Sequence, residues 1–86
     1  MKHATPSALD HLEDVLQSLR KLGELKEKTR GVYYLKSKAF LHFHEDPLGL
    51  FADVRVGPDW QRLPVNSSAE RRDLFRFVKR TLAAGA

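Results

Sequence analysis

The sequence predicts a two-layer α+β domain: an N-terminal helix, an antiparallel meander of three or four strands, and a C-terminal helix. Near both ends of the chain, apolar residues recur at three- and four-residue steps, which is the period of an amphipathic helix. Between residues 31 and 65 the period falls to two, and short runs are separated by glycine and proline turns. Two helices packed on one face of such a sheet would bury its apolar side.

The first helix is expected over residues 6–22. Pro6 suits the first helical turn, and Gly23 suits the position just after the last. Residues 24–28 are expected to add one more short helical turn. The apolar stripe of this helix comprises Leu9, Leu12, Val15, Leu16, Leu19 and Leu22.

Four strands are expected, over residues 32–35, 39–44, 50–56 and 60–65. Because the connections are short, strands that are consecutive in the sequence are expected to be adjacent in the sheet. Pro64 has no N–H to give to a neighbouring strand, so the last strand should lie at an edge or end there.

The last helix is expected to begin at Asn66 or Ser67. Ser67 followed by Glu70 is a capping-box pattern. Leu74, Val78 and Leu82 then repeat at four-residue steps and form the buried stripe. We expect residues 1–86 to form one domain, with flexible ends at 1–5 and 83–86.

Composition narrows the class of protein. The chain has 86 residues and no cysteine, which excludes disulfides, thiol nucleophiles and cysteine-ligated metal sites. No apolar run approaches the ~20 residues of a membrane span, so a soluble, cytoplasmic protein without a membrane partner is expected. The net charge of +4 only weakly favours an acidic partner, because the same charge serves ordinary solubility.

The stretch FLHFHED, residues 40–46, leads into the turn Asp46-Pro47-Leu48-Gly49. A three-residue loop with Gly49 as a bulge residue would place His42 opposite Val54. The alternation of apolar residues favours another register, in which His42 faces Asp53. The preferred turn contributes about 1 kcal/mol of stability, whereas each large apolar side chain left exposed to water costs about 1.5–3 kcal/mol. The second register, in which His42 faces Asp53, is therefore predicted.

In that register the two faces of the hairpin differ in character. Leu41 and Phe43 face inward with the apolar residues of the next strand. The polar face is then expected to carry His42, His44, Asp53 and Arg55, with Phe40 and Phe51 beside them.

His42, His44 and Asp53 are candidate metal ligands. The two histidines are two residues apart on a strand and point the same way, and imidazole with carboxylate suits zinc or iron. The alternative interpretation is a half-exposed cross-strand His–Asp pair that stabilises the hairpin. His42 with Asp53 also resembles half of an acid–base pair, but no placed nucleophile or phosphate-binding loop accompanies it. We therefore expect neither an enzyme nor a cofactor.

Basic residues suggest a nucleic-acid-binding surface as another possibility. They lie on one side of the last helix and near the first hairpin, where they would follow phosphates. The alternative is a solvated helix face, which is the commoner meaning of such a run. The residues concerned are Arg72, Arg76, Lys79, Arg80, Lys36 and Lys38.

Apolar residues beyond the helix stripes favour association with another protein or a second copy. Phe75 and Phe77 flank the last stripe on opposite sides, and Trp60 opens the last strand. A short chain has a thin core, and extra apolar surface often marks an interface. A non-enzymatic domain that binds a protein or itself is thus the first expectation, nucleic-acid binding the second and a metal site the third.

The run GVYYLKSKAFLHFHEDPLGLFADVRVG, residues 31–57, resembles short uncharacterised bacterial proteins. Over residues 12–56, a helix ending near LGELKEKT followed by these strands is also similar to the MmcQ/YjbR-type domains. The resemblance rests on aromatic residues and turn glycines. It implies an α+β fold and a leaning toward nucleic acid, by analogy of fold, and it assigns no binding residues.

Overall fold

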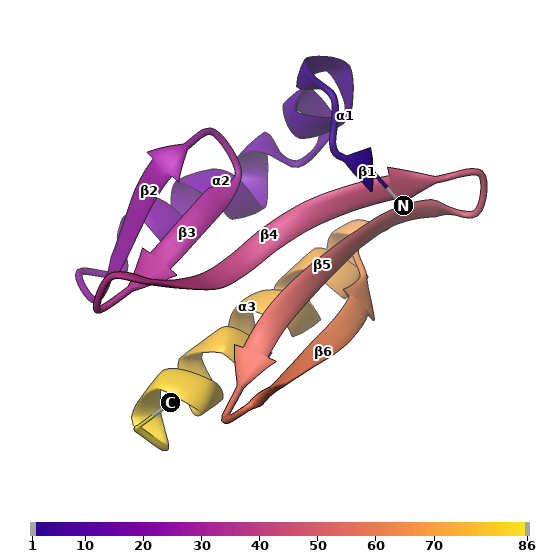
Figure 1. The fold of residues 1–86 in the computed structure, drawn as a ribbon. Coiled ribbons are helices and arrows are strands. Elements are labelled where there is room, and N and C mark those ends of the chain that lie inside the picture. The colour runs from indigo at the N-terminus through magenta and orange to yellow at the C-terminus, as the bar shows by residue number, and fades with distance from the viewer. Residues whose placement is uncertain (1, 86) are drawn as a thin grey trace.

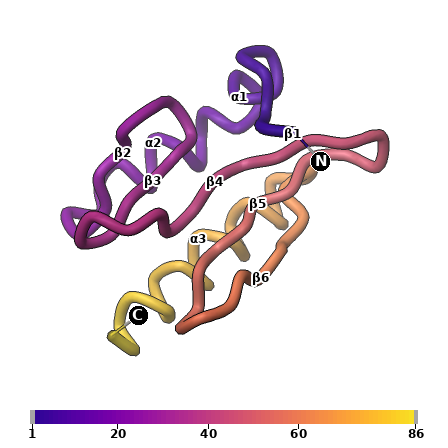
Figure 2. Tube along the Cα trace, viewed as in Figure 1, coloured from indigo at the N-terminus to yellow at the C-terminus, as the bar shows by residue number. Residues whose placement is uncertain are grey.

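The computed structural model describes residues 2–85 and confirms the α+β fold (Figure 1). The sheet is antiparallel with strand order β2-β3-β4-β5-β6, and β1 pairs with β4. The Cα trace in Figure 2 follows this meander and returns along α3. In chain order the elements are β1 (Lys2–His3), α1 (Pro6–His11), α2 (Glu13–Arg20), β2 (Leu25–Thr29), β3 (Val32–Leu35), β4 (Lys38–Asp46), β5 (Gly49–Val56), β6 (Asp59–Pro64) and α3 (Ser68–Ala83).

The core lies between the sheet and the helices α2 and α3, which lie behind the sheet in the view of Figure 1. The predicted stripes supply most of it, since side chains at helical spacing share one face. The other face of β4 and β5 is left without a helix, and the candidate ligands lie there. Fully buried core residues include Leu12, Leu16, Leu19, Leu41, Phe43, Val54, Leu74 and Val78.

The predicted single helix over residues 6–22 is wrong, because the helix is interrupted at Leu12, between α1 and α2. Leu12 has φ −99° and ψ 4°, and its N–H bonds to Leu9 three residues back. The break lets α1 bring Leu9 close to Gly31 and Phe43 while α2 continues along the sheet. Tertiary contact thus overrides a continuous amphipathic pattern.

The helical turn predicted for residues 24–28 is also wrong, because this segment forms the edge strand β2. Its sequence is polar, as is common for edge strands. Glu27 anchors it by accepting hydrogen bonds from Arg20 and from the N–H of Gly31. These partners lie on α2 and in the turn to β3, so short-range periodicity does not reveal the strand.

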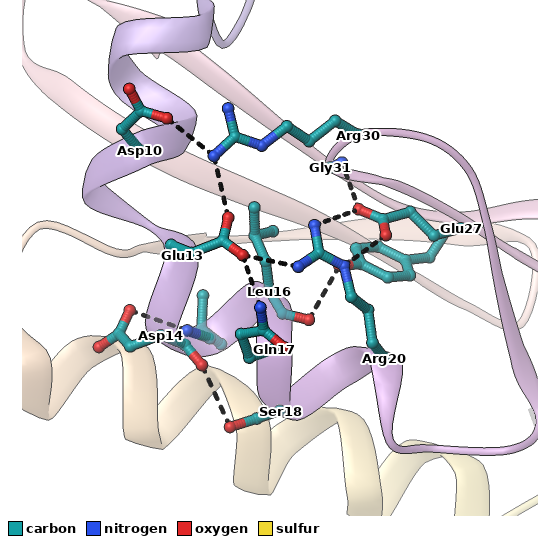
Figure 3. A network of polar contacts seen from close by, with 12 residues as sticks. Asp10, Glu13, Asp14, Leu16, Gln17, Ser18, Arg20, Glu27, Arg30 and Gly31 are labelled. Atoms are coloured by element: carbon teal, nitrogen blue, oxygen red, sulfur yellow. Dashed lines mark hydrogen bonds and ion pairs between the residues drawn. The ribbon is translucent and has the colours of Figure 1, made fainter.

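An ion-pair network links the helices to this hairpin (Figure 3). Arg20 lies between Glu13 and Glu27, at 2.7 and 2.6 Å. Arg30 reaches Asp10 at 2.8 Å and Glu13 at 2.9 Å. The Arg30 and Arg20 guanidinium groups lower the pKa of Glu13 to about 2, so this carboxylate stays charged throughout the ordinary pH range.

The predicted register of the β4–β5 hairpin is confirmed. Leu41 pairs with Val54, His42 with Asp53, and the two-residue loop leaves Asp46 opposite Gly49. The Asp46 carboxylate accepts a hydrogen bond from the Leu48 N–H at 2.8 Å, which closes the turn.

Two further predictions at the end of the chain are confirmed. Strand β6 is an edge strand and ends at Pro64. The capping box of α3 is present, with the Ser67 side chain accepting from the Glu70 N–H at 3.0 Å and Glu70 bonding back to the Ser67 N–H.

Phe40 departs from its predicted place on the polar face. It is 2% exposed and belongs to the core. Between β3 and β4 the register shifts, so that Tyr33 faces Leu41 while Tyr34 faces Ala39, and Phe40 is the extra residue of a bulge. A bulge bends its strand and re-aims side chains, which interrupts the alternation that placed Phe40 outside.

The predicted flexible ends, 1–5 and 83–86, include residues 1 and 86, which lie outside the described part of the chain. Lys2 and His3 form β1, and Ala83 is the last residue of α3. Among residues 2–85, no helix has the length and apolar character that crossing a bilayer requires.

Candidate metal centre

The candidate site occupies the sheet face that carries no helix. His42 and His44 alternate along β4 with the buried residues Leu41 and Phe43, so both imidazoles point away from the core. The confirmed register places Asp53 on β5 directly opposite His42. A rigid pair of central strands therefore presents all three side chains together.

The three side chains converge on a small volume. Nδ1 of His42 lies 2.6 Å from Nε2 of His44, and that Nε2 lies 3.3 Å from Oδ2 of Asp53. One ligand atom from each residue lies within 4.8 Å of the others. Nδ1 of His44 is buried and has no hydrogen-bond partner among the described residues, whereas Nε2 is the nitrogen of His44 that faces His42 and Asp53.

Arg62 on β6 holds the carboxylate of Asp53. Its Nε donates to Oδ1 at 2.8 Å and its Nη2 donates to Oδ2 at 2.9 Å. These hydrogen bonds lower the pKa of Asp53 although burial opposes them, so the carboxylate is ionised at neutral pH. Asp53 itself is only 7% exposed. Because a carboxylate has about four lone-pair sites, it retains acceptor capacity beyond the two Arg62 bonds.

Burial keeps His42 neutral. Desolvation lowers the pKa of His42, and the neighbouring His44 lowers it further, while Asp53 opposes the change. A neutral imidazole has a free lone pair, which is the form that binds metal ions. An uncharged His42 beside an ionised Asp53 is thus a suitable ligand pair at neutral pH.

Two aromatic side chains border the cluster. The indole of Trp60 on β6 lies with its centroid 4.8 Å from the His42 ring, and the Arg55 guanidinium lies 4.4 Å from the Trp60 centroid. His3 on β1 stacks on His44 with centroids 5.2 Å apart and an interplanar angle of 28°. The face therefore carries three histidines, although only two were predicted there.

The sequence pattern does not point to His3 or Arg62. A two-residue strand has no measurable period, so nothing places His3 beside β4. Arg62 could have been found, because a two-residue Gly57-Pro58 loop pairs Val56 with Asp59 and carries Arg62 opposite Asp53. Counting back from that turn would have identified the partner of the carboxylate.

Five of the six residues predicted to bind nucleic acid line three different hollows of the surface. Lys36 and Lys38 line one hollow that reaches Gly57, and Arg80 lines another that also reaches Gly57. Arg72 and Arg76 line a separate hollow against α2, and Arg76 is paired with Asp73.

The other members of the predicted nucleic-acid and association surfaces are placed as follows. Lys79 lies 5.7 Å above the ring of Phe75. Phe75 and Phe77 are partly buried and pack against the core. Trp60 is 39% exposed, on the histidine face. Association with a protein or a second copy stays a prediction.

Comparison of the chain with known protein families, with curated proteins and with solved structures found no match. The resemblance to MmcQ/YjbR-type domains therefore stays a prediction.

Proposed function

We propose that this chain is a small, non-enzymatic metal-binding domain that holds one divalent transition-metal ion, with zinc favoured. The ligands are Nδ1 of His42, Nε2 of His44 and Oδ2 of Asp53. The observation that carries the proposal is that one ligand atom from each of these three residues lies within 4.8 Å of the others, on two central strands. Two imidazoles and a carboxylate form a donor set that zinc and non-haem iron both accept.

The distances support a tetrahedral ion. Two ligand atoms bound at about 2.0–2.1 Å in tetrahedral geometry lie about 3.3 Å apart. Nε2 of His44 and Oδ2 of Asp53 already have that separation, at 3.3 Å. Nδ1 of His42 and Nε2 of His44 are closer, at 2.6 Å, as suits a hydrogen bond through one shared proton. Binding would displace that proton and open the pair by about 0.7 Å, a small side-chain rotation.

The environment also favours an ion over a simple cross-strand pair. Two of the three ligands, His42 and Asp53, have the required protonation state at neutral pH, because burial lowers the pKa of His42 and Arg62 lowers the pKa of Asp53. Arg62 additionally orients the carboxylate, as partners of metal ligands commonly do.

The test is titration of chelator-treated protein with Zn²⁺ at pH 7.5, followed by calorimetry and by the ring signals of the four histidines in NMR spectra. We expect one ion per chain, with His42 and His44 ring signals shifted and the His11 signal unmoved. His44→Ala should weaken binding at least tenfold, since a ligand is lost.

His11→Ala is the matched control, because His11 is exposed on α1 and lies outside the strands that carry the site. Circular dichroism should confirm that each variant is folded. Equal Zn²⁺ affinity of the wild type and His44→Ala, or unmoved His42 and His44 rings, would show that the proposal is wrong. Repeating the titration with Fe²⁺ under anaerobic conditions ranks the two candidate ions.

A further inference from the structure

The geometry points to a fourth ligand: we propose that His3 completes the coordination sphere and that strand β1 thereby closes the metal site. This inference rests on the proposed metal-binding function. Three protein ligands leave a position for water or an added ligand, whereas four protein ligands leave none. The position of β1 would therefore decide whether the ion can accept a further ligand.

Backbone pairing brings His3 to the site. β1 pairs with the end of β4 so that His3 lies opposite His44 and Lys2 opposite Glu45. Directly opposed side chains on one face of an antiparallel pair have Cβ atoms about 4.5–5.5 Å apart. The His3 ring accordingly stacks on the His44 ring, on the same side of the sheet as His42.

The spacing of the three imidazoles matches one tetrahedral ion. An imidazole bound to zinc through a ring nitrogen has its centroid about 3.2 Å from the ion, so three such centroids lie about 5.2 Å from one another. The observed centroid separations are 4.6 Å for His42–His44, 5.2 Å for His3–His44 and 5.9 Å for His3–His42. These separations lie on both sides of the expected separation, so small rotations bring all three rings to a common ion.

His3 differs from the other two histidines in its freedom to move. It is exposed, and its nitrogens are not among the atoms that lie within 4.8 Å of one another. Its ring must therefore turn to bind, and an exposed side chain can do so without disturbing the core. His42 and His44, in contrast, are held on a central strand.

Strand β1 is suited to pair with β4 and to separate from it again. It has two residues, and two further contacts secure the segment after it: the Ala4 N–H donates to the Phe43 carbonyl at 3.1 Å, and the Thr5 N–H donates to Oε1 of Glu45 at 2.6 Å. So short a pairing opens at a low free-energy cost. A bond from His3 to the ion would hold β1 on the sheet, and release of β1 would expose one coordination position.

The test uses Co²⁺, whose visible absorption reports coordination, on the full chain at pH 7.5, with thiocyanate as the added ligand. In the wild type we expect a tetrahedral Co²⁺ spectrum that thiocyanate leaves unchanged. In His3→Ala we expect Co²⁺ affinity at least about tenfold weaker and a spectrum that thiocyanate alters, because a position is open. His11→Ala should behave like the wild type.

A second measurement covers the case in which His3→Ala simply loses β1. Zn²⁺ added to the wild type should shift the His3 ring signals and slow amide hydrogen exchange at residues 3–5. Equal affinities with thiocyanate binding to both proteins, or unmoved His3 rings beside shifted His42 and His44 rings, would overturn the role of His3 and leave the three-ligand site intact. Failure of the wild type to bind either ion would overturn both proposals.

Discussion

Arg62 and Asp53 form a two-pronged ion pair across β5 and β6, with hydrogen bonds of 2.8 and 2.9 Å. The pair explains how a carboxylate that is 7% exposed stays ionised on a sheet face crowded with imidazoles. Arg62 supplies the largest contribution to the lowered pKa of Asp53, and His44 and His42 add to it. The ion pair is therefore part of the candidate site as well as of the sheet.

Replacing Arg62 should raise the pKa of Asp53 and remove a pH-dependent contribution to stability. The folded-state pKa of Asp53 is lowered, so its contribution is present above the unfolded value of 3.8 and is lost as the pH falls through the folded value. Arg62→Met should accordingly be less stable than the wild type at pH 7, with the difference shrinking as the pH falls below 3.8. Urea unfolding across this range measures it.

Arg72→Met is the control for Arg62→Met, since Arg72 is exposed on α3 and lies away from the carboxylate. It should leave the Asp53 pKa unchanged, as followed by carbon NMR of the carboxyl group. An Asp53 pKa that is equally low in Arg62→Met would show that the ion pair does not govern its ionisation.

Metal-free protein should lose stability as the pH falls from 7.5 to 5.5. Burial lowers the folded-state pKa of His42 below its ordinary value of 6.5, so as the pH falls the unfolded chain binds a proton before the folded chain does. This contribution is complete above pH 6.5 and is lost as the pH falls toward the folded pKa. Urea unfolding in the presence of a chelator at the two pH values measures the loss.

His42→Gln should show a smaller difference in unfolding free energy between pH 7.5 and 5.5 than the wild type. His11→Gln, changed at an exposed position on α1, should keep the wild-type difference. A His42→Gln protein with the full wild-type pH dependence would contradict the assignment to His42.

Trp60 should report the state of the site by fluorescence. It is the one tryptophan of the chain, and its ring centroid lies 4.8 Å from that of His42. A protonated imidazole quenches indole emission, so emission should fall as the pH drops through the pKa of His42. Saturating Zn²⁺ should move this quenching to lower pH, because the ion competes with protons for the ring nitrogen.

His42→Ala should abolish both the acid quenching and its response to Zn²⁺. The Arg55 guanidinium lies 4.4 Å from the Trp60 centroid and is present in both proteins, so it does not account for a difference between them. A quenching midpoint that does not move with Zn²⁺ would argue against an ion bound at His42.

Gly49→Ala should destabilise the fold more than Gly57→Ala. Both glycines have positive φ, +134° and +60°, so alanine is strained at either position by about 1 kcal/mol. At Gly49 an added Cβ would lie 2.5 Å from Oδ1 of Asn66, whereas at Gly57 it meets nothing within 4 Å. Oδ1 of Asn66 accepts from the Leu50 N–H at 2.8 Å, so the clash also displaces a hydrogen bond.

We therefore expect a loss of about 2–3 kcal/mol for Gly49→Ala against about 1 kcal/mol for Gly57→Ala, in urea unfolding. Gly23→Ala, at a position with open space and no positive φ, should not destabilise by backbone strain. Equal losses at positions 49 and 57 would show that Asn66 yields without cost.

Much of the sheet could be predicted from short-range pattern. Alternation in β4 and β5 determined that Leu41 and Phe43 lie inside and that His42 faces Asp53, because burying large apolar side chains outweighs turn preference. The same reasoning failed at Phe40, where a bulge interrupts the period of two. It failed again for residues 24–28, whose polar strand is anchored by the ion pair between Glu27 and Arg20 of α2.

The sequence by itself determined the α+β architecture, the hairpin register and the His42–His44–Asp53 set, since each follows from residues close together in the chain or from the pairing of neighbouring strands. Only the tertiary structure decided that His3 lies beside this set and that the first helix is interrupted at Leu12. Those features need segments far apart in the chain to meet. The free energies of these contacts depend on the packed fold, so the local periodicity of the sequence does not predict the contacts.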